Sequence, residues 1–287
     1  MTAEPPIDRT STIVAPLVYL AQGSERPVRY NFPPPPGVPV QSGTFVAEPL
    51  PIVDARPLAD RFDLDRQGFE LLRRPSAVTE FDDPAHVRAV YYPEVEAEVW
   101  AATGAERVIA FDHNVRSRPR AQGGATAVKE PVKRVHNDFT ATSGPVRAAA
   151  ELAAAGIDPA VLEGQRFALV NLWRPIRAPV EESPLAFCDA RSLAAEDFVT
   201  ADLVYPDRVG EIYQFRHRPE HRWYYFPRLA PDEALLIKCY DSATDGPARF
   251  TAHSAFDDPT SPADARPRES IEVRTLVLYG PGTQPRA

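Results

Sequence analysis

The spacing of apolar residues predicts two helices before residue 160 and mostly strands after it. Residues 94–102, which follow Tyr92-Pro93, have a helical pattern. Ser143 is a suitable N-cap for an alanine-rich helix over 145–155, which Gly156 would end. Beyond that glycine, short runs rich in β-branched and aromatic residues are separated by turn-forming segments.

Short strands joined by turns fit two packed sheets, a jelly roll, better than a parallel sheet with crossover helices. The expected strands are 14–20, 68–72, 107–111, 132–136, 166–172, 185–188, 211–215, 223–226, 234–240, 249–252 and 271–279. We therefore predict a mainly β fold with flanking helices. The ranges 132–136, 249–252 and 271–279 would be neighbours at one mouth of the barrel.

The chain shows no internal repeat and no linker between residues 107 and 279, so a single domain is expected there. Residues 1–60 are rich in proline and predict an N-terminal arm packed on the core, and 61–287 would form one jelly-roll domain with helical insertions. The run 33–36, four prolines, is interpreted as a stiff surface segment, with binding to an aromatic groove as the alternative.

Composition narrows the function classes. The 287 residues are 44% hydrophobic and 25% charged, with a net charge of -8, which argues against a general nucleic-acid binder. The two cysteines form no CxxC pair, and no signal peptide or membrane-spanning run is visible, so we expect a cytoplasmic protein without a membrane partner. A homodimer is compatible with these features.

One short motif has the spacing of metal ligands. In a strand alternate side chains share a face, so His136 and Asp138 would project together while Asn137 points away. A second histidine beside them would complete a two-histidine, one-carboxylate face, which holds non-haem Fe(II) and leaves positions open for substrates. Taken alone, the tripeptide is also compatible with an ordinary surface hydrogen bond.

The third ligand must come from the remaining histidines. His253 lies among small and apolar residues, whereas His217 and His221 lie in the arginine-rich segment 216–222, where positive charge discourages cation binding. We expect that segment to be a solvated loop or a lid facing the substrate. His253 is the better candidate, and His221 stays open.

Residues near the C-terminus suggest an anion clamp. Alternation places Arg268, Ser270, Glu272 and Arg274 on one strand face, and such a row of polar groups requires water or a charged ligand. A dicarboxylate co-substrate would satisfy Arg268 and Ser270 together, with Arg274 as a second candidate.

A second group of polar residues lies on an expected strand. Asn171 and Arg174 are candidate co-substrate or substrate contacts, with turn stabilisation as the alternative, and Trp173 between them is expected to pack in the core.

In combination these residues resemble a known family. The motifs His136-Asn137-Asp138, Asn171 to Pro175, His221 to Phe226, Lys238 to Ser242, His253 to Phe256 and Pro267 to Arg274 are similar to those of the cephem 7-hydroxylase component and the fungal AsaB-type hydroxylase/desaturases. The resemblance covers about residues 69–279. It implies a double-stranded β-helix, another name for the jelly roll or cupin-like barrel.

The family resemblance implies a Fe(II)- and 2-oxoglutarate-dependent oxygenase that uses dioxygen. His136, Asp138 and His253 would bind Fe(II), and Arg268 with Ser270 would bind the far carboxylate of 2-oxoglutarate, with Arg274 still open. Because Asp138 is retained, hydroxylation or desaturation is favoured over halogenation. The substrate would be a small molecule of secondary metabolism, and the arginines of 216–222 hint at an anionic or carbonyl-bearing one.

Two other functions are compatible with the same barrel. One is a redox-neutral cupin-like metalloenzyme, an isomerase or hydrolase, which would have no task for Arg268 and Ser270. The other is a non-catalytic jelly-roll binding protein, in which the three metal-ligand types would be incidental.

Overall fold

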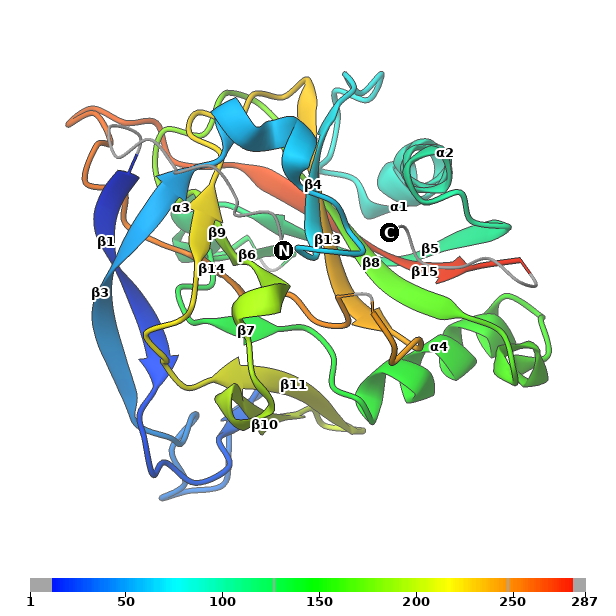
Figure 1. The fold of residues 1–287 in the computed structure, drawn as a ribbon, viewed down its shortest axis with the longest axis horizontal. Helices are drawn as coiled ribbons and strands as arrows, with labels where there is room; N and C mark the ends of the chain where they lie inside the picture. Colours follow the sequence, from blue (N-terminus) through cyan, green and yellow to red (C-terminus); the bar gives the residue numbers. More distant parts are fainter. Residues whose placement is uncertain (1–11, 126, 247, 281–287) are drawn as a thin grey trace.

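The computed structural model describes residues 12–125, 127–246 and 248–280, and its main feature is a pair of facing β-sheets (Figure 1). The six-stranded sheet contains, in order, β4 (Phe69–Arg73), β13 (Glu233–Asp241), β8 (Phe167–Pro175), β15 (Ser270–Leu278), β5 (Arg107–Arg116) and β6 (Val128–Lys129). The nine-stranded sheet contains β1 (Thr12–Leu20), β3 (Phe45–Asp54), β12 (Trp223–Tyr225), β9 (Leu185–Cys188), β14 (His253–Ala255), β7 (His136–Asn137), β11 (Val209–Phe215), β10 (Phe198–Val204) and β2 (Val28–Tyr30). The predicted jelly roll is confirmed.

Helices cover the outside of this barrel (Figure 1). The longer ones are α2 (Tyr92–Thr103), which lies beside β5 and β15, and α4 (Ser143–Ala154). The short ones are η2 (Arg56–Arg61), α1 (Pro84–His86), the π-helix η3 (Val87–Tyr91), α3 (Arg118–Gln122), η4 (Pro159–Leu162), η5 (Ala190–Ser192) and η6 (Ala195–Asp197). None of the helices in the described part of the chain has the length and apolar character needed to span a bilayer.

The six-stranded sheet is buried on both faces. One face packs inside the barrel, where Trp173 belongs to a cluster with Phe187 and Phe226 of the other side. Its opposite face packs on α2, where Leu172 belongs to a cluster with Val95. Successive residues of β8 therefore point in opposite directions, and all nine of them are buried. This alternation decides which side chains can reach a site inside the barrel.

Several element boundaries differ from the sequence prediction. The expected strand over 132–136 is reduced to His136–Asn137, and the strand expected over 249–252 begins only at His253. Ser143 is the first residue of α4 and not its N-cap, and its hydroxyl accepts a hydrogen bond from the backbone N–H of Thr140. The two strand boundaries were misplaced because the apolar pattern within a segment does not show where a partner strand begins to pair with it.

The proline-rich N-terminal part supplies strands to the nine-stranded sheet. Beyond the expected strand near residues 14–20, it forms β2 and β3, which the sequence analysis missed. Pro49 and Pro51 lie within β3 and lower its apparent strand propensity. β12 pairs only with residues 52–54 of that strand, so both prolines lie outside the stretch that it pairs with. The first eleven residues of the predicted arm are outside the described residues.

Helix α4 contacts the barrel closely at Gly144. Gly144 is buried, and a Cβ atom at this position would lie 2.5 to 2.9 Å from three ring atoms of Tyr240 in β13. The ring belongs to the core between the sheets. The contact therefore fixes how closely the helix that follows Asp138 approaches the barrel.

We predict that Gly144→Ala destabilises the protein although alanine favours helices. Overpacking against Tyr240 should lower the free energy of unfolding by about 1–3 kcal/mol, which urea denaturation followed by circular dichroism would measure. The double variant Gly144→Ala with Tyr240→Leu should lose less than the sum of the two single variants. Strict additivity would show that the ring does not limit the helix.

Candidate metal centre

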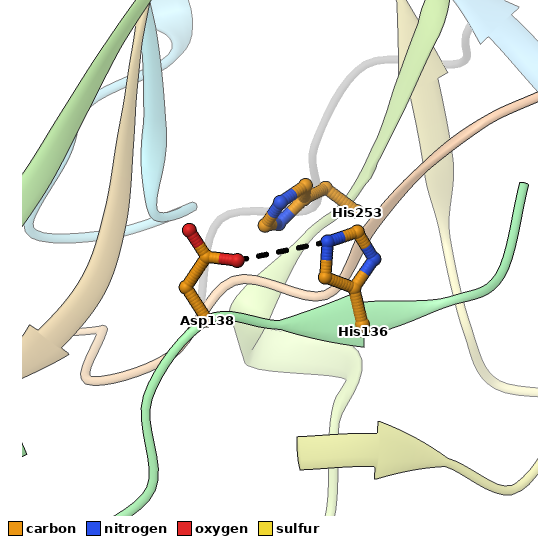
Figure 2. Close-up of side chains that lie close together, drawn as sticks. All are labelled: His136, Asp138 and His253. Carbon is orange, nitrogen blue, oxygen red and sulfur yellow. Dashed lines mark ion pairs between the residues drawn. The ribbon is translucent and has the colours of Figure 1, made fainter. Parts of the chain in front are cut away.

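Three side chains with metal-binding atoms converge inside the barrel. β7 and β14 are neighbouring antiparallel strands in which His136 and His253 are direct partners, and Asp138 follows β7 by one residue. Their ligand atoms all lie within 4.8 Å of one another. Figure 2 shows the two imidazoles and the carboxylate facing a common point, with the distance between His136 Nε2 and Asp138 Oδ1 at 3.7 Å.

Backbone carbonyls orient both imidazoles. His136 Nδ1 lies 2.7 Å from the carbonyl oxygen of Arg134, and His253 Nδ1 lies 2.9 Å from that of Thr251. Because a carbonyl oxygen only accepts hydrogen bonds, each Nδ1 carries the proton and each Nε2 presents a lone pair. Burial lowers the pKa of His136 to about 3, so its ring is neutral at physiological pH.

Asn137 ties the two ligand-bearing strands together. Its side chain is fully buried and points away from the metal ligands, as alternation predicts. The amide donates to the carbonyls of Phe139 and Cys239 and accepts from the backbone N–H of Thr251. Thr251 in turn holds His253, so this one amide fixes the separation of the ligands.

Asp138 is a buried carboxylate with defined partners. Its Oδ2 accepts from Asn171 Nδ2 at 2.9 Å and from Arg274 at 2.8 to 2.9 Å, which leaves Oδ1 facing His136. Burial alone would raise the pKa of this carboxyl, but the charge of Arg274 and the hydrogen bond from Asn171 hold it well below its ordinary value. The group is therefore ionised and positioned to bind a cation.

The donor set fits Fe(II). Two neutral imidazole nitrogens and one carboxylate oxygen on one side of a point form the facial arrangement that non-haem iron uses, and the opposite side stays free for other ligands. His253 is buried and His136 and Asp138 are largely buried, and each of the three side chains has a hydrogen-bond partner on the side away from the common point, which is how proteins orient metal ligands.

Arg268 and Ser270 lie at the start of β15 with polar atoms that lack partners. Both residues are at least 97% buried, and neither Arg268 Nε nor Ser270 Oγ has a hydrogen-bond partner among the described residues. The guanidinium lies 5.4 Å from the Trp173 ring and donates to the carbonyl of Ser183. Burial, followed by the charge of Arg116, lowers the pKa of Arg268 to about 9, so the group stays charged at neutral pH.

Arg274 has a different environment from Arg268. Its guanidinium forms ion pairs with Asp138, Asp112 and Glu272, at 2.8 to 3.1 Å. The three carboxylates already satisfy it, whereas Arg268 has no carboxylate within ion-pair distance in the described ranges. An incoming anion would therefore find its partner more readily at Arg268.

The contacts of Arg174 do not fit the role at the co-substrate that was expected from the sequence. Its guanidinium faces α2, where it forms a bidentate ion pair with Glu98 at 2.8 and 2.9 Å. Asn171 faces the barrel interior, and three residues along a strand reverse the direction of the side chain. Asn171 donates to Asp138 through Nδ2, and its Oδ1 has no hydrogen-bond partner among the described residues, so its contact with the co-substrate or substrate stays a prediction.

The interpretation of 216–222 as a solvated loop or lid is also wrong for its central histidine. His221 is buried, with Nδ1 2.9 Å from the Tyr19 hydroxyl and Nε2 2.9 Å from Asp197 Oδ2. Both ring nitrogens are therefore occupied, one by Tyr19 of β1 and the other by Asp197 of η6. His253, and not His221, lies with His136 and Asp138.

Two charged side chains near the site lie beyond the strand predicted over 107–111. Asp112 shares Arg274 with Asp138 and Glu272, and Arg116 lies beside Ser270 in the register of β5 and β15. Extending the predicted strand by five residues would have included Asp112 and Arg116. The available signal was that Asp112, Asn114 and Arg116 occupy alternate positions and therefore share one face.

Comparison with known proteins gives a consistent result. The model of an oxidoreductase/YMDC permease-like domain matches residues 17–278. The chain is 34% identical to the Fe(II)/2-oxoglutarate-dependent dioxygenase nvfI of Aspergillus novofumigatus, over 90% of this chain and 93% of that protein. It is 33% identical to the hydroxylase/desaturase efuI of Hormonema carpetanum, over 82% of this chain and 85% of that one. The solved structure of the iron and alpha-ketoglutarate-dependent endoperoxidase NvfI has a TM-score of 0.84 and 29% identity, covering 94% of this chain and 99% of that chain.

The depressed pKa of His136 predicts acid sensitivity of the metal-free protein. Since the folded pKa is about 3 and the unfolded value is about 6.5, the unfolded state binds more protons between those pH values. Stability should therefore fall as the pH is lowered through this window, by roughly 2 kcal/mol from pH 6.5 to 4.5.

Urea denaturation of the metal-free protein at the two pH values would measure this loss. His136→Gln should show a smaller loss, and His86→Gln, at an exposed position outside the site, should keep the full loss. Identical pH dependence in the wild type and His136→Gln would contradict the assignment.

Proposed function

The chain belongs to the family of Fe(II)/2-oxoglutarate-dependent dioxygenases that includes fungal hydroxylase/desaturases, and we propose that it oxidises a small molecule at an iron ion bound by His136, Asp138 and His253. The observation that carries the proposal is the convergence of these three donors in a barrel whose strand β15 brings Arg274 to Asp138 and begins at the unpaired polar groups of Arg268 and Ser270.

The family membership decides several of the sequence-based predictions. The resemblance to hydroxylase/desaturases, the requirement for Fe(II), 2-oxoglutarate and dioxygen, and the assignment as an enzyme are confirmed. The comparisons favour neither the redox-neutral metalloenzyme nor the non-catalytic binding protein. A cytoplasmic location, a homodimeric state and a single domain over 61–287 stay predictions.

We propose separate roles for the two arginines on β15. Arg268 and Ser270 would bind the far carboxylate of 2-oxoglutarate, because the buried guanidinium has an unpaired Nε and no carboxylate partner, and the buried hydroxyl has no partner, so both gain hydrogen bonds from it. Arg274 would instead hold Asp138 ionised and in position, together with Asn171. Trp173 would keep the Arg268 guanidinium in place through stacking.

The bound iron and co-substrate supply the oxidising chemistry with dioxygen. The chain provides the geometry: two imidazoles and one charged carboxylate face a common point, and the arginine and serine of the proposed clamp are buried between the sheets. His136 and Asp138 also line a cavity of about 740 Å³, which can hold a small molecule beside the metal. Hydroxylation or desaturation is the outcome that we propose, because Asp138 occupies the third ligand position.

The assignment of the metal centre predicts a spectroscopic signal. Anaerobic addition of Fe(II) followed by 2-oxoglutarate should produce the visible charge-transfer band of a 2-oxo acid chelated to iron. His253→Ala should abolish the band because one of the three metal ligands is lost, and His86→Ala should retain it. Absence of the band from wild-type protein that has been shown to be folded would contradict the proposed function.

The two arginine roles predict opposite binding defects. Arg268→Gln should weaken 2-oxoglutarate binding by about 10- to 100-fold, since a charge-assisted contact contributes about 1.5–3 kcal/mol, while Fe(II) affinity changes little. Arg274→Gln should weaken Fe(II) binding by about 10- to 100-fold, as expected for the partner of a metal ligand.

Equilibrium titrations of both variants, which undergo the same change of charge, would measure the two affinities. If Arg268→Gln keeps the wild-type affinity for 2-oxoglutarate and Arg274→Gln loses it, the roles must be exchanged.

A further inference from the structure

The cavity that His136 and Asp138 line has more unpaired positive than unpaired negative side chains in its wall. Its inner end is formed by His136 and Asp138, and its outer part includes residues of β2, β10 and β11. A molecule that reaches the iron from this side must lie in this cavity. The charges in the cavity wall therefore indicate which class of molecule the cavity binds.

All carboxylates of the wall have cationic partners. Asp112 and Asp138 pair with Arg274, Glu151 pairs with Arg147, and Asp202 and Glu211 pair with Arg26. None of these acidic groups is left to attract a cation into the cavity.

Four cations of the same wall have no carboxylate within ion-pair distance in the part of the chain that the structure describes. They are Arg29, Arg116, Lys129 and Arg134, which we call the cationic wall. Where they have side-chain hydrogen bonds, the acceptors are neutral: the carbonyl of Glu130 for Arg116, the amide of Asn114 for Lys129, and the amide of Gln41 for Arg134.

The members of the cationic wall are close enough to repel one another. Arg116 and Lys129 are register partners on β5 and β6. Partial removal from water and then the charge of Arg116 lower the pKa of the Lys129 ammonium. Clustered cations that no carboxylate contacts repel one another in a cavity, and an anion bound among them would relieve the repulsion.

We propose that the cationic wall binds the anionic group of the substrate and that the substrate is a small organic anion, such as a carboxylic acid. The inference rests on the proposed function, because it assigns the cavity beside the iron to the substrate. The arginines concerned differ from those of 216–222, which suggested an anionic substrate from the sequence. In the structure that segment packs around buried His221, whereas the cationic wall lines the cavity.

The cationic wall is distinct from the co-substrate clamp except at Arg116. That residue is the register partner of Ser270 and therefore adjoins the clamp. Arg29 and Lys129 have exposed side chains and lie on β2 and β6, at two other sides of the cavity. These two residues can be replaced with little risk to the fold or to the binding of 2-oxoglutarate.

Matched acids and amides test the proposal. We would measure, by anaerobic calorimetry, the binding of benzoate, naphthoate and decanoate and of their amides to protein loaded with Fe(II) and saturating 2-oxoglutarate. At least one acid should bind about 10-fold more tightly than its amide, and Arg29→Gln/Lys129→Gln should reduce this preference to less than about 3-fold. The double variant Arg73→Gln/Arg228→Gln, with the same change of charge at exposed positions outside the wall, should keep the preference.

Three other results of this experiment would contradict the proposal. Equal binding of acids and amides, failure of every acid to bind, or an undiminished preference in Arg29→Gln/Lys129→Gln would overturn the proposal. The visible band of iron-bound 2-oxoglutarate is recorded on the same samples. If the band is present, only the cationic wall is overturned; if it is absent from the wild type, the proposed function fails first.

Discussion

The pairing of buried charges is the constraint on which this structure depends. A charged group inside a protein is costly unless an opposite charge and hydrogen bonds compensate it. Most of the interior ions follow this rule: Arg174 pairs with Glu98, Lys238 with Asp65 and Asp241, and Asp138 with Arg274. These pairs position the strands and, in the case of Asp138, hold a metal ligand in its ionised form.

The departures from this rule mark the functional regions. Arg268 is buried without a carboxylate, and Ser270 beside it has a hydroxyl without a partner. In the cationic wall the partly buried Arg116 and Arg134 lack carboxylates as well, although every carboxylate that lines the cavity is paired. An interior charge that the fold leaves uncompensated is best explained by a ligand that supplies the opposite charge. The two groups of cations thus correspond to two different anions.

The sequence predicted the barrel and singled out the three candidate metal ligands because both depend on short-range patterns. Strand alternation placed His136 with Asp138, and the apolar surroundings of His253 distinguished it from His221. The sequence could not show that Arg174 would find Glu98, because that pair joins β8 to a helix 76 residues earlier. Strict use of alternation would have separated Asn171 from Arg174. The assignment of Asp112 and Arg116 to the site required the true length of β5 and its register with β15.

We propose that the uncompensated Arg268 and Ser270 receive the far carboxylate of 2-oxoglutarate while His136, Asp138 and His253 hold the iron. A crystal structure of the protein grown anaerobically with Fe(II) and 2-oxoglutarate would decide this. We expect iron bonded to Nε2 of both histidines and to Oδ1 of Asp138, with the far carboxylate in hydrogen-bonding contact with Arg268 and Ser270. A far carboxylate bound to Arg274, or iron bound away from the three ligands, would contradict it.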